Sequence, residues 1–208
     1  MTQRLLELSG ISSLRPARRG PTPDCLRTGA RVLDVGCGDG GSVDLLNSAG
    51  YAADGVDADE QLAEIAASRN PGASILQASA ESLPHADSSY DAVMFECSLS
   101  LTDSARSLAE ARRVLRPGGA LMVADVFSGT SGDGGTIPHL VEEDFLKNLA
   151  ALGYIVTGTE DHTQSLRDYY AQMLMDSGTA AAPCSAAERE AIKRINPRYL
   201  LYTAGKPG

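Results

Sequence analysis

The chain has no Cys-x-x-Cys pair and no long apolar run. Its four cysteines, Cys25, Cys37, Cys97 and Cys184, are widely separated, which argues against a disulfide framework and against a metal cluster. No segment reaches the roughly 18 apolar residues of a membrane-spanning helix, and the first residues lack the pattern of a signal peptide. We therefore expect a cytoplasmic protein that binds no metal and has no membrane partner.

Positive charge is also scarce. The formal net charge of -9 argues against a broad basic surface, and therefore against nucleic acid as a partner. Residues 1–31 are the exception, because six arginines there are opposed only by Glu7 and Asp24. This segment is either a solvated arm or a cationic lid beside an acidic substrate, and the sequence leaves both interpretations open.

A length of 208 residues suits one α/β domain with a substantial core. We assign residues 31–208 to this domain. Residues 1–30 are expected to form a short N-terminal helix and then an irregular segment, because three prolines fall between residues 16 and 23.

The glycine-rich stretch Arg31–Gly41 organises the rest of the chain. Residues 32–35 are apolar except for Asp34, as in a buried parallel strand, and four glycines follow between residues 36 and 41. Apolar residues then return at a helical spacing, so the predicted order is strand, glycine turn and helix. This order is typical of a nucleotide-binding crevice, in which backbone N–H groups and the helix N-terminus face the ligand.

Asp34 separates two interpretations of this stretch. Gly36, Gly38 and Gly41 fit the dinucleotide fingerprint, which by itself also allows an NAD-type oxidoreductase. A carboxylate at the strand end would repel a pyrophosphate, whereas it suits a ligand with an ammonium or sulfonium group. The sequence Val-Leu-Asp-Val-Gly-Cys-Gly-Asp-Gly, which ends at Gly40, resembles the first motif of class I S-adenosylmethionine-dependent methyltransferases.

Two later segments agree with a nucleoside ligand. Asp57 follows an apolar strand about 20 residues beyond the glycines, where a carboxylate can accept both ribose hydroxyls. The run Ala-Ser-Ala-Glu-Ser-Leu-Pro at residues 78–84 resembles the third methyltransferase motif, which passes the adenine. Ser79 stands where the family usually has aspartate, so we expect a weaker hydrogen bond to the adenine amino group.

A further signature is Arg-Val-Leu-Arg-Pro-Gly-Gly at residues 113–119. It resembles the helix-to-strand corner of the same methyltransferases, and a nicotinamide dehydrogenase does not need it. We expect Pro117 to end the helix and the two glycines to turn the chain into the next strand.

The resemblance implies an α/β fold with a doubly wound, mostly parallel seven-stranded sheet whose last strand is antiparallel. Strands are expected within residues 32–35, 51–57, 74–77, 92–96, 120–125, 154–159 and 199–204. Helices are expected at 59–69, 103–115, 138–153, 163–176 and 185–195. In the first of these helices we expect Leu62, Ile65 and Ala66 to face inward.

The resemblance also implies the cofactor, S-adenosylmethionine, with S-adenosylhomocysteine as the product of methyl transfer to a small-molecule acceptor. Carried over position by position, the predicted cofactor-binding residues are Asp34, Gly36, Cys37, Gly38, Asp57, Ala58, Ser79, Ala80 and Glu96. The acceptor is expected above residues 96–98, because ligands bind at the carboxyl ends of the strands in such sheets.

Two residues are candidates for a catalytic role. His139 follows the fifth strand and its imidazole titrates near neutrality, which suits a general base, although a surface histidine fits the same position. Cys97 could act as a nucleophile or could only pack against the ligand. Tyr169, Tyr170 and Met173 could line an acceptor pocket or belong to the core.

Three functions stay open at this stage. The favoured one is a small-molecule methyltransferase, active as a monomer or a homodimer. The others are an NAD-type oxidoreductase and a non-catalytic protein with the methyltransferase fold that serves as a partner of another enzyme. The sequence does not name the acceptor atom, whether oxygen, nitrogen, carbon or sulfur.

Overall fold

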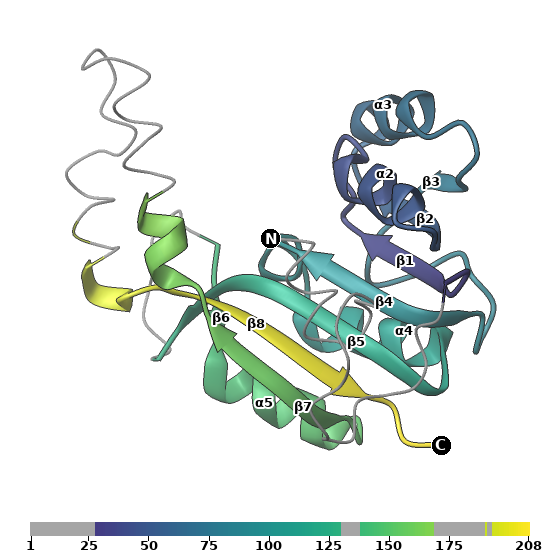
Figure 1. Ribbon diagram of the computed structural model, residues 1–208. Helices are drawn as coiled ribbons and strands as arrows, with labels where there is room; N and C mark the ends of the chain where they lie inside the picture. Colours follow the sequence, from purple (N-terminus) through teal and green to yellow (C-terminus); the bar gives the residue numbers. More distant parts are fainter. Residues whose placement is uncertain (1–27, 130–137, 169–189, 191–192) are drawn as a thin grey trace, which may run out of the picture.

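The computed structural model describes residues 28–129, 138–168, 190 and 193–208 (Figure 1). The strands are β1 Arg31–Val35, β2 Ala52–Asp57, β3 Ile75–Gln77, β4 Tyr90–Glu96, β5 Leu115–Ser128, β6 Leu140–Val141, β7 Ile155–Asp161 and β8 Arg198–Gly205. The helices are α2 Gly41–Ser48, α3 Glu60–Arg69, α4 Ser104–Val114 and α5 Glu142–Ala151, with a short 3-10 helix, η1, at Leu99–Leu101.

The strands form one twisted sheet in the order β3-β2-β1-β4-β5-β8-β7 (Figure 1). All pairs along this path are parallel except those of β8, which runs antiparallel to both β5 and β7. The predicted mostly parallel sheet with an antiparallel last strand is confirmed. The two residues of β6 add an eighth strand, because they pair with the end of β5.

Helices cover both faces of the sheet, with α2 and α3 on one face and α4 and α5 on the other (Figure 1). Alternation along the strands divides the side chains between two cores. Val32 and Met94 pack on the α2 face, while Leu33 and Phe95 pack on the α4 face. Central strands buried on both faces are the reason why their sequences read as nearly continuous apolar runs.

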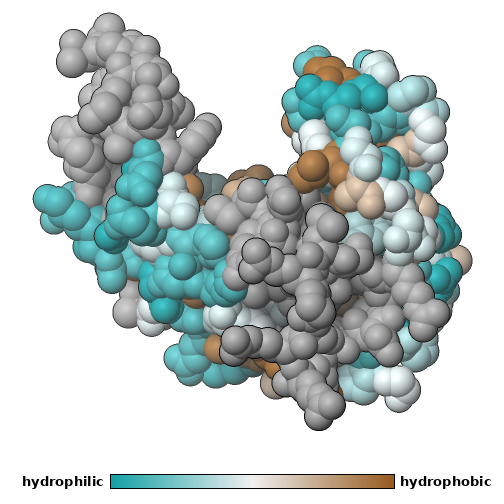
Figure 2. Space-filling view, viewed as in Figure 1, coloured by the Kyte–Doolittle hydropathy of each residue, from teal (hydrophilic) through white to brown (hydrophobic). Residues whose placement is uncertain are grey.

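The predicted inward face of α3 was wrong in part. Ala63 and Ala66 are buried, whereas Leu62 lies partly in solvent and Ile65 is 50% exposed. The reason is close packing, since a Cβ added at Gly40 would lie 2.9 Å from the Cβ of Ala66. Only small side chains fit there, so the larger ones turn outward. Figure 2 shows apolar surface on the part of the molecule that carries α2 and α3.

Two predicted boundaries also needed correction. The helix expected from residue 138 begins at Glu142, because Leu140 and Val141 pair with Phe127 and Ser128 at the end of β5. Pro117 does not end α4, which stops at Val114. The chain continues there as β5, with an irregular register opposite the start of β4. In both places the sheet offers backbone partners that helical periodicity does not reveal.

The C-terminal Lys206 closes this corner. Its ammonium group donates to the carbonyl oxygens of Arg112 and Leu115, at 2.9 and 2.6 Å. These carbonyls lie at the end of α4, where the helix itself supplies no partner and where positive charge is favourable. Lys206, which directly follows β8, therefore caps the C-terminal end of α4 where the chain enters β5.

Several predictions fall outside the described residues. These are the N-terminal segment up to residue 27, the loop at 130–137, most of the two helices expected at 163–176 and 185–195, and with them Tyr169, Tyr170 and Met173. Within the ranges that the structure covers, no helix is long and apolar enough to cross a membrane.

Candidate ligand-binding site

Two adjoining cavities lie at the carboxyl ends of β1, β2 and β4, each of about 370 Å³. Gly36 and Gly38 line both, so the glycine turn after β1 forms their shared wall. The first cavity extends toward α2, and the second toward α3 and η1. An elongated ligand lying across the turn would occupy both.

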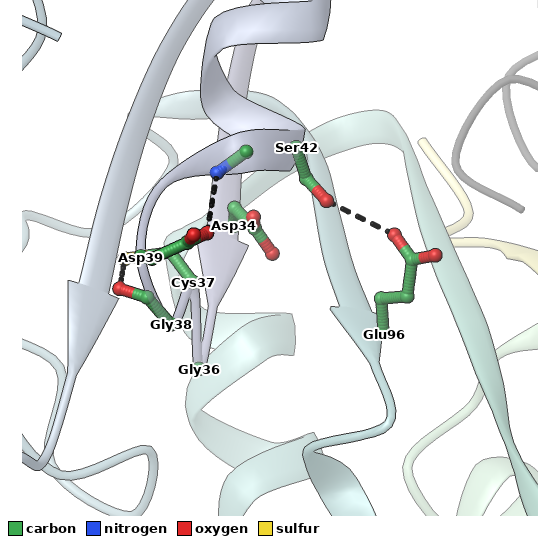
Figure 3. Close-up of a pocket in the computed structure, with 8 residues that line it drawn as sticks. Asp34, Gly36, Cys37, Gly38, Asp39, Ser42 and Glu96 are labelled. Carbon is green, nitrogen blue, oxygen red and sulfur yellow. Dashed lines mark hydrogen bonds between the residues drawn. The ribbon is translucent and has the colours of Figure 1, made fainter. Parts of the chain in front are cut away.

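Sheet geometry brings the acidic groups of this site together. Asp34 of β1 pairs in register with Met94 of β4, so Glu96, two residues further along β4, projects from the same face of the sheet. Figure 3 shows both carboxylates on the side of the glycine turn and of Ser42, whose hydroxyl donates to Glu96 at 3.1 Å. Among the described residues that line the two cavities, none is a lysine or an arginine.

Asp34 is the most perturbed acid of the site. Its side chain is only 2% exposed, and its Oδ1 atom has no hydrogen-bond partner. Burial raises the pKa of this carboxyl to about 8, and the negative charges of Glu96 and Asp57 add to the effect. An unpartnered buried acceptor in a cavity lined by acids is suited to a positively charged ligand group.

Asp57 lies at the junction of the glycine turn with the second cavity. One carboxylate oxygen accepts the backbone N–H of Gly38 at 2.8 Å, and the other accepts that of Asp59 at 2.9 Å. Each oxygen of an ionised carboxylate keeps a further lone pair for another donor. The group is thus held by the backbone and still able to accept two vicinal hydroxyls.

Two glycines of the turn have different roles. Gly36 has a φ of +78°, and a Cβ there would lie 2.4 Å from the Cβ of Ser98, so the position excludes any side chain. Gly38 has a φ of +54°, and nothing lies within 4 Å of where its Cβ would be. Gly36 therefore serves packing, whereas Gly38 leaves the backbone open to a ligand.

The second cavity is mainly apolar. Leu62 of α3 and Leu101 of η1 contribute exposed side chains to it, and Ala80 and Phe95 contribute smaller or buried surfaces. Its polar edge is the segment 79–81, in which the Ser79 hydroxyl donates to the Glu81 carboxylate. Such a combination suits a flat heterocycle that has one polar edge.

The structure brings together most of the residues that the sequence singled out. All nine predicted cofactor-binding residues line one of the two cavities, and so does Cys97. His139 lines neither; it immediately precedes β6. Gly41 and Ser98, which the sequence had placed in the glycine fingerprint and below the acceptor, also line the cavities. Sequence reasoning gave no site role to several other lining residues, namely Val35, Asp39, Ser42, Leu62, Ala78, Glu81, Phe95, Leu101 and Thr102. Their approach depends on the packing of α2, α3 and η1, for which a linear pattern gives no signal.

The chemistry of Cys97 does not favour a nucleophile. Partial burial raises the pKa of its thiol above the ordinary value, so the reactive thiolate is scarce at neutral pH. Its Sγ atom lies 3.3 Å from the hydroxyl of Tyr199. Its φ of +54° is unusual for a residue other than glycine, and it turns the chain from β4 into η1.

Residues 33–123 match the methyltransferase domain family. This segment, a little under half of the chain, has the sequence of a methyltransferase domain. The matched range runs from β1 to the middle of β5 and so contains both cavities. The predicted resemblance is confirmed.

Two curated relatives match about half of this chain. A probable S-adenosylmethionine-dependent methyltransferase of Mycobacterium tuberculosis (strain ATCC 25618 / H37Rv) is 39% identical over 103 residues, which is 49% of this chain and 37% of that protein. The demethylmenaquinone methyltransferase of Renibacterium salmoninarum is 35% identical over 105 residues, 50% of this chain and 44% of that protein. The matched regions span less than half of the length of these relatives.

Solved structures share the fold of this methyltransferase domain over nearly the whole chain. The geranyl diphosphate C-methyltransferase of Streptomyces coelicolor A3(2), solved with Mg2+, geranyl diphosphate and S-adenosyl-L-homocysteine, has a TM-score of 0.77 at 15% identity, covering 99% of this chain and 78% of that one. The [4+2]-cyclase SpnF has a TM-score of 0.72 at 24% identity, covering 99% and 81%. The second likeness shows that enzymes named for different reactions share this fold.

Proposed function

We propose that this protein transfers a methyl group from S-adenosylmethionine to a small-molecule acceptor. The observation that carries the proposal is the Oδ1 atom of Asp34, which is buried without a partner in a cavity lined by acids. The sequence relatives named as S-adenosylmethionine-dependent methyltransferases support the same assignment.

The residues present fit this cofactor. Asp34 and Glu96 offer negative charge for the methionyl ammonium and the sulfonium, and the open backbone at Gly38 leaves room for the chain between them. Asp57 can accept the ribose hydroxyls, and the apolar second cavity with Ser79 on its edge can take the adenine. When bound, the cofactor supplies an electrophilic methyl carbon on a positively charged sulfur.

The contribution of the protein is then positioning. Asp34, Glu96 and the glycine turn fix the methionyl end, and Asp57 fixes the ribose, so that the methyl group has one orientation relative to an acceptor beyond β4. The side chain next to this position is that of Cys97, held by Tyr199. We keep His139 as a candidate base for acceptors that must lose a proton.

An NAD-type oxidoreductase is the weaker alternative. A dinucleotide brings a pyrophosphate to the glycine turn, where the cavity offers Asp34, Asp39 and Glu96. The part of the chain that the structure describes supplies no cationic side chain to this cavity. Repulsion between these charges opposes such a ligand. A non-catalytic partner protein with the same fold would keep the cofactor site and lack turnover.

The first experiment is calorimetric titration with S-adenosylmethionine and S-adenosylhomocysteine, with NAD(P) as competitor. We expect micromolar binding, no competition by NAD(P), and about 100-fold weaker binding by Asp57→Ala, because the variant loses a charged acceptor for two hydroxyls. Absence of binding to both sulfur compounds would refute the proposal. Methyl transfer to a panel of small acceptors then separates an enzyme from a non-catalytic partner.

A further inference from the structure

We propose that Glu81 determines which base the second cavity accepts, by holding the Ser79 hydroxyl so that it can only accept a hydrogen bond from the ligand. A purine nucleoside with a 6-amino group would be selected over one with a 6-oxo group. The inference rests on the proposed function, because it concerns the nucleoside end of the same ligand.

The base of a nucleoside belongs in the second cavity on geometric grounds. Asp57 lines the second cavity and accepts the backbone N–H of Gly38, which lines both cavities. A ribose bound to Asp57 therefore directs its charged substituent past the glycine turn toward Asp34 and its base toward α3 and η1. Leu62 and the 68% exposed Leu101 border that end of the cavity with apolar surface. A planar base gains most by covering such surface.

Most polar side chains of the cavity already have partners. Ser98 donates its hydroxyl to the carbonyl of Val35 at 2.6 Å, and Thr102 donates to that of Leu99 at 2.9 Å. Cys97 is paired with the Tyr199 hydroxyl. The polar edge that remains for a base is therefore the segment of Ser79 and Glu81.

The hydrogen-bond inventory of Ser79 leaves one acceptor site. A serine hydroxyl has one donor proton and two lone pairs. The proton of Ser79 is donated to one oxygen of the Glu81 carboxylate, and one lone pair accepts the backbone N–H of Glu81 at 3.2 Å. The second lone pair is left for the ligand. While Glu81 remains ionised and in place, Ser79 has no proton to offer to a base.

A second hydrogen bond holds the Glu81 carboxylate in the position from which it accepts the Ser79 proton. Its other carboxylate oxygen accepts the backbone N–H of Asp103, at the start of α4, at 2.9 Å. The hydroxyl of Ser79 and this N–H both lower the pKa of Glu81, so the group stays ionised and accepts only. The Ser79 and Glu81 side chains thus present lone pairs and no donor to the base.

The consequence is a preference between bases. A 6-amino group donates to this edge, whereas a 6-oxo group would place its own lone pairs against those of Ser79. Ser79 is exposed in the ligand-free protein, and a bound base would cover its hydroxyl. An acceptor that the base covers and leaves without a donor costs enough to weaken binding roughly 10-fold to 100-fold. The aspartate usual at position 79 in the family would impose the same preference through its charge, and here Glu81 does so through a neutral hydroxyl.

The test compares S-adenosylhomocysteine with S-inosylhomocysteine, in which the 6-amino group is replaced by a 6-oxo group. Calorimetry on the wild type should give at least about 10-fold weaker binding of the inosyl compound. In Glu81→Gln the amide oxygen can still accept the Asp103 N–H, and the NH2 group can donate to Ser79, whose proton is then free to turn toward a 6-oxo group. The ratio of the two dissociation constants should fall to about 1.

Two further variants keep the result interpretable. Ser79→Ala leaves the contact between Glu81 and Asp103 possible and should also bring the ratio close to 1. Glu64→Gln removes a carboxylate from the exposed side of α3 and should leave the ratio at the wild-type value. A loss of affinity that is equal for both ligands would indicate a structural role only, and would overturn the inference.

The outcomes also separate the inference from the proposed function. If the wild type binds S-adenosylhomocysteine and does not discriminate, or if Glu81→Gln keeps the full discrimination, the inference is wrong and the proposed cofactor stands. If the wild type binds neither compound, both fail together.

Discussion

Asp34→Asn is expected to stabilise the ligand-free protein at alkaline pH while weakening ligand binding. The carboxyl is buried beside Glu96 and Asp57, and its pKa is raised from 3.8 to about 8. The folded protein therefore holds this proton more tightly than the unfolded chain does. Between these two pKa values the folded state binds more protons, so stability falls as pH rises through this window.

The size of the effect follows from the shift. Above the unfolded pKa of 3.8, the free energy of unfolding falls by about 1.36 kcal/mol for each pH unit. At pH 7, about three units higher, the folded protein has therefore lost about 4 kcal/mol of stability. Asparagine carries no charge and avoids this loss, although burying its amide costs about 1 to 3 kcal/mol. We expect a net gain of about 2 kcal/mol at pH 7, and slightly more at pH 8; a gain of about 2 kcal/mol corresponds to roughly 4 to 8 °C in melting temperature for a chain of this size.

Thermal unfolding at two pH values is the assay. At pH 8 the variant should melt above the wild type. At pH 4.5 both side chains are neutral, so the variant should melt at the same temperature or lower. Asp39→Asn, an exposed change in the same turn, should show no such reversal. A variant that is less stable than the wild type at both pH values would refute the reasoning.

The same carboxyl links ligand binding to protons. A positively charged ligand group next to Asp34 favours its ionised form, so binding at pH 7 should release roughly one proton. Titrations with S-adenosylhomocysteine in phosphate and in Tris should therefore differ in apparent enthalpy. Asp34→Asn should bind at least about 10-fold more weakly, with no dependence on the buffer.

Two further predictions concern the scaffold. Gly36→Ala should lower the free energy of unfolding by about 2 kcal/mol or more, because its Cβ would meet that of Ser98 at 2.4 Å and its φ is positive; urea denaturation measures this, and Gly38→Ala, which meets no atom within 4 Å, is the milder comparison. Lys206→Met should cost about 1 to 2 kcal/mol by removing both of its hydrogen bonds to α4, without changing the affinity for S-adenosylhomocysteine. An unchanged urea midpoint in either Gly36→Ala or Lys206→Met would contradict its prediction.

Neighbouring residues in the sequence determine several elements of this protein. The strand, glycine turn and helix around Asp34 could be predicted because each depends on neighbours in the chain: an apolar run, glycines where φ is positive, and apolar residues at a helical spacing. Asp57 could also be predicted from the chain, because it ends an apolar strand, and strand ends of this kind meet the ligand in a doubly wound sheet.

Only the tertiary structure decided the electrostatics and the walls of the site. The sequence pointed to Asp34, but its missing partner and its raised pKa arise because β4 brings Glu96 to the same face and the fold excludes water. The inward face of α3 depends on how closely Gly40 meets Ala66, so Leu62 turns to the cavity against its helical pattern. The bond between Ser79 and Glu81 is short in sequence, but its anchor at Asp103 comes from 22 residues away. Contacts of this kind depend on packing across the sheet, which periodicity along one chain segment does not encode.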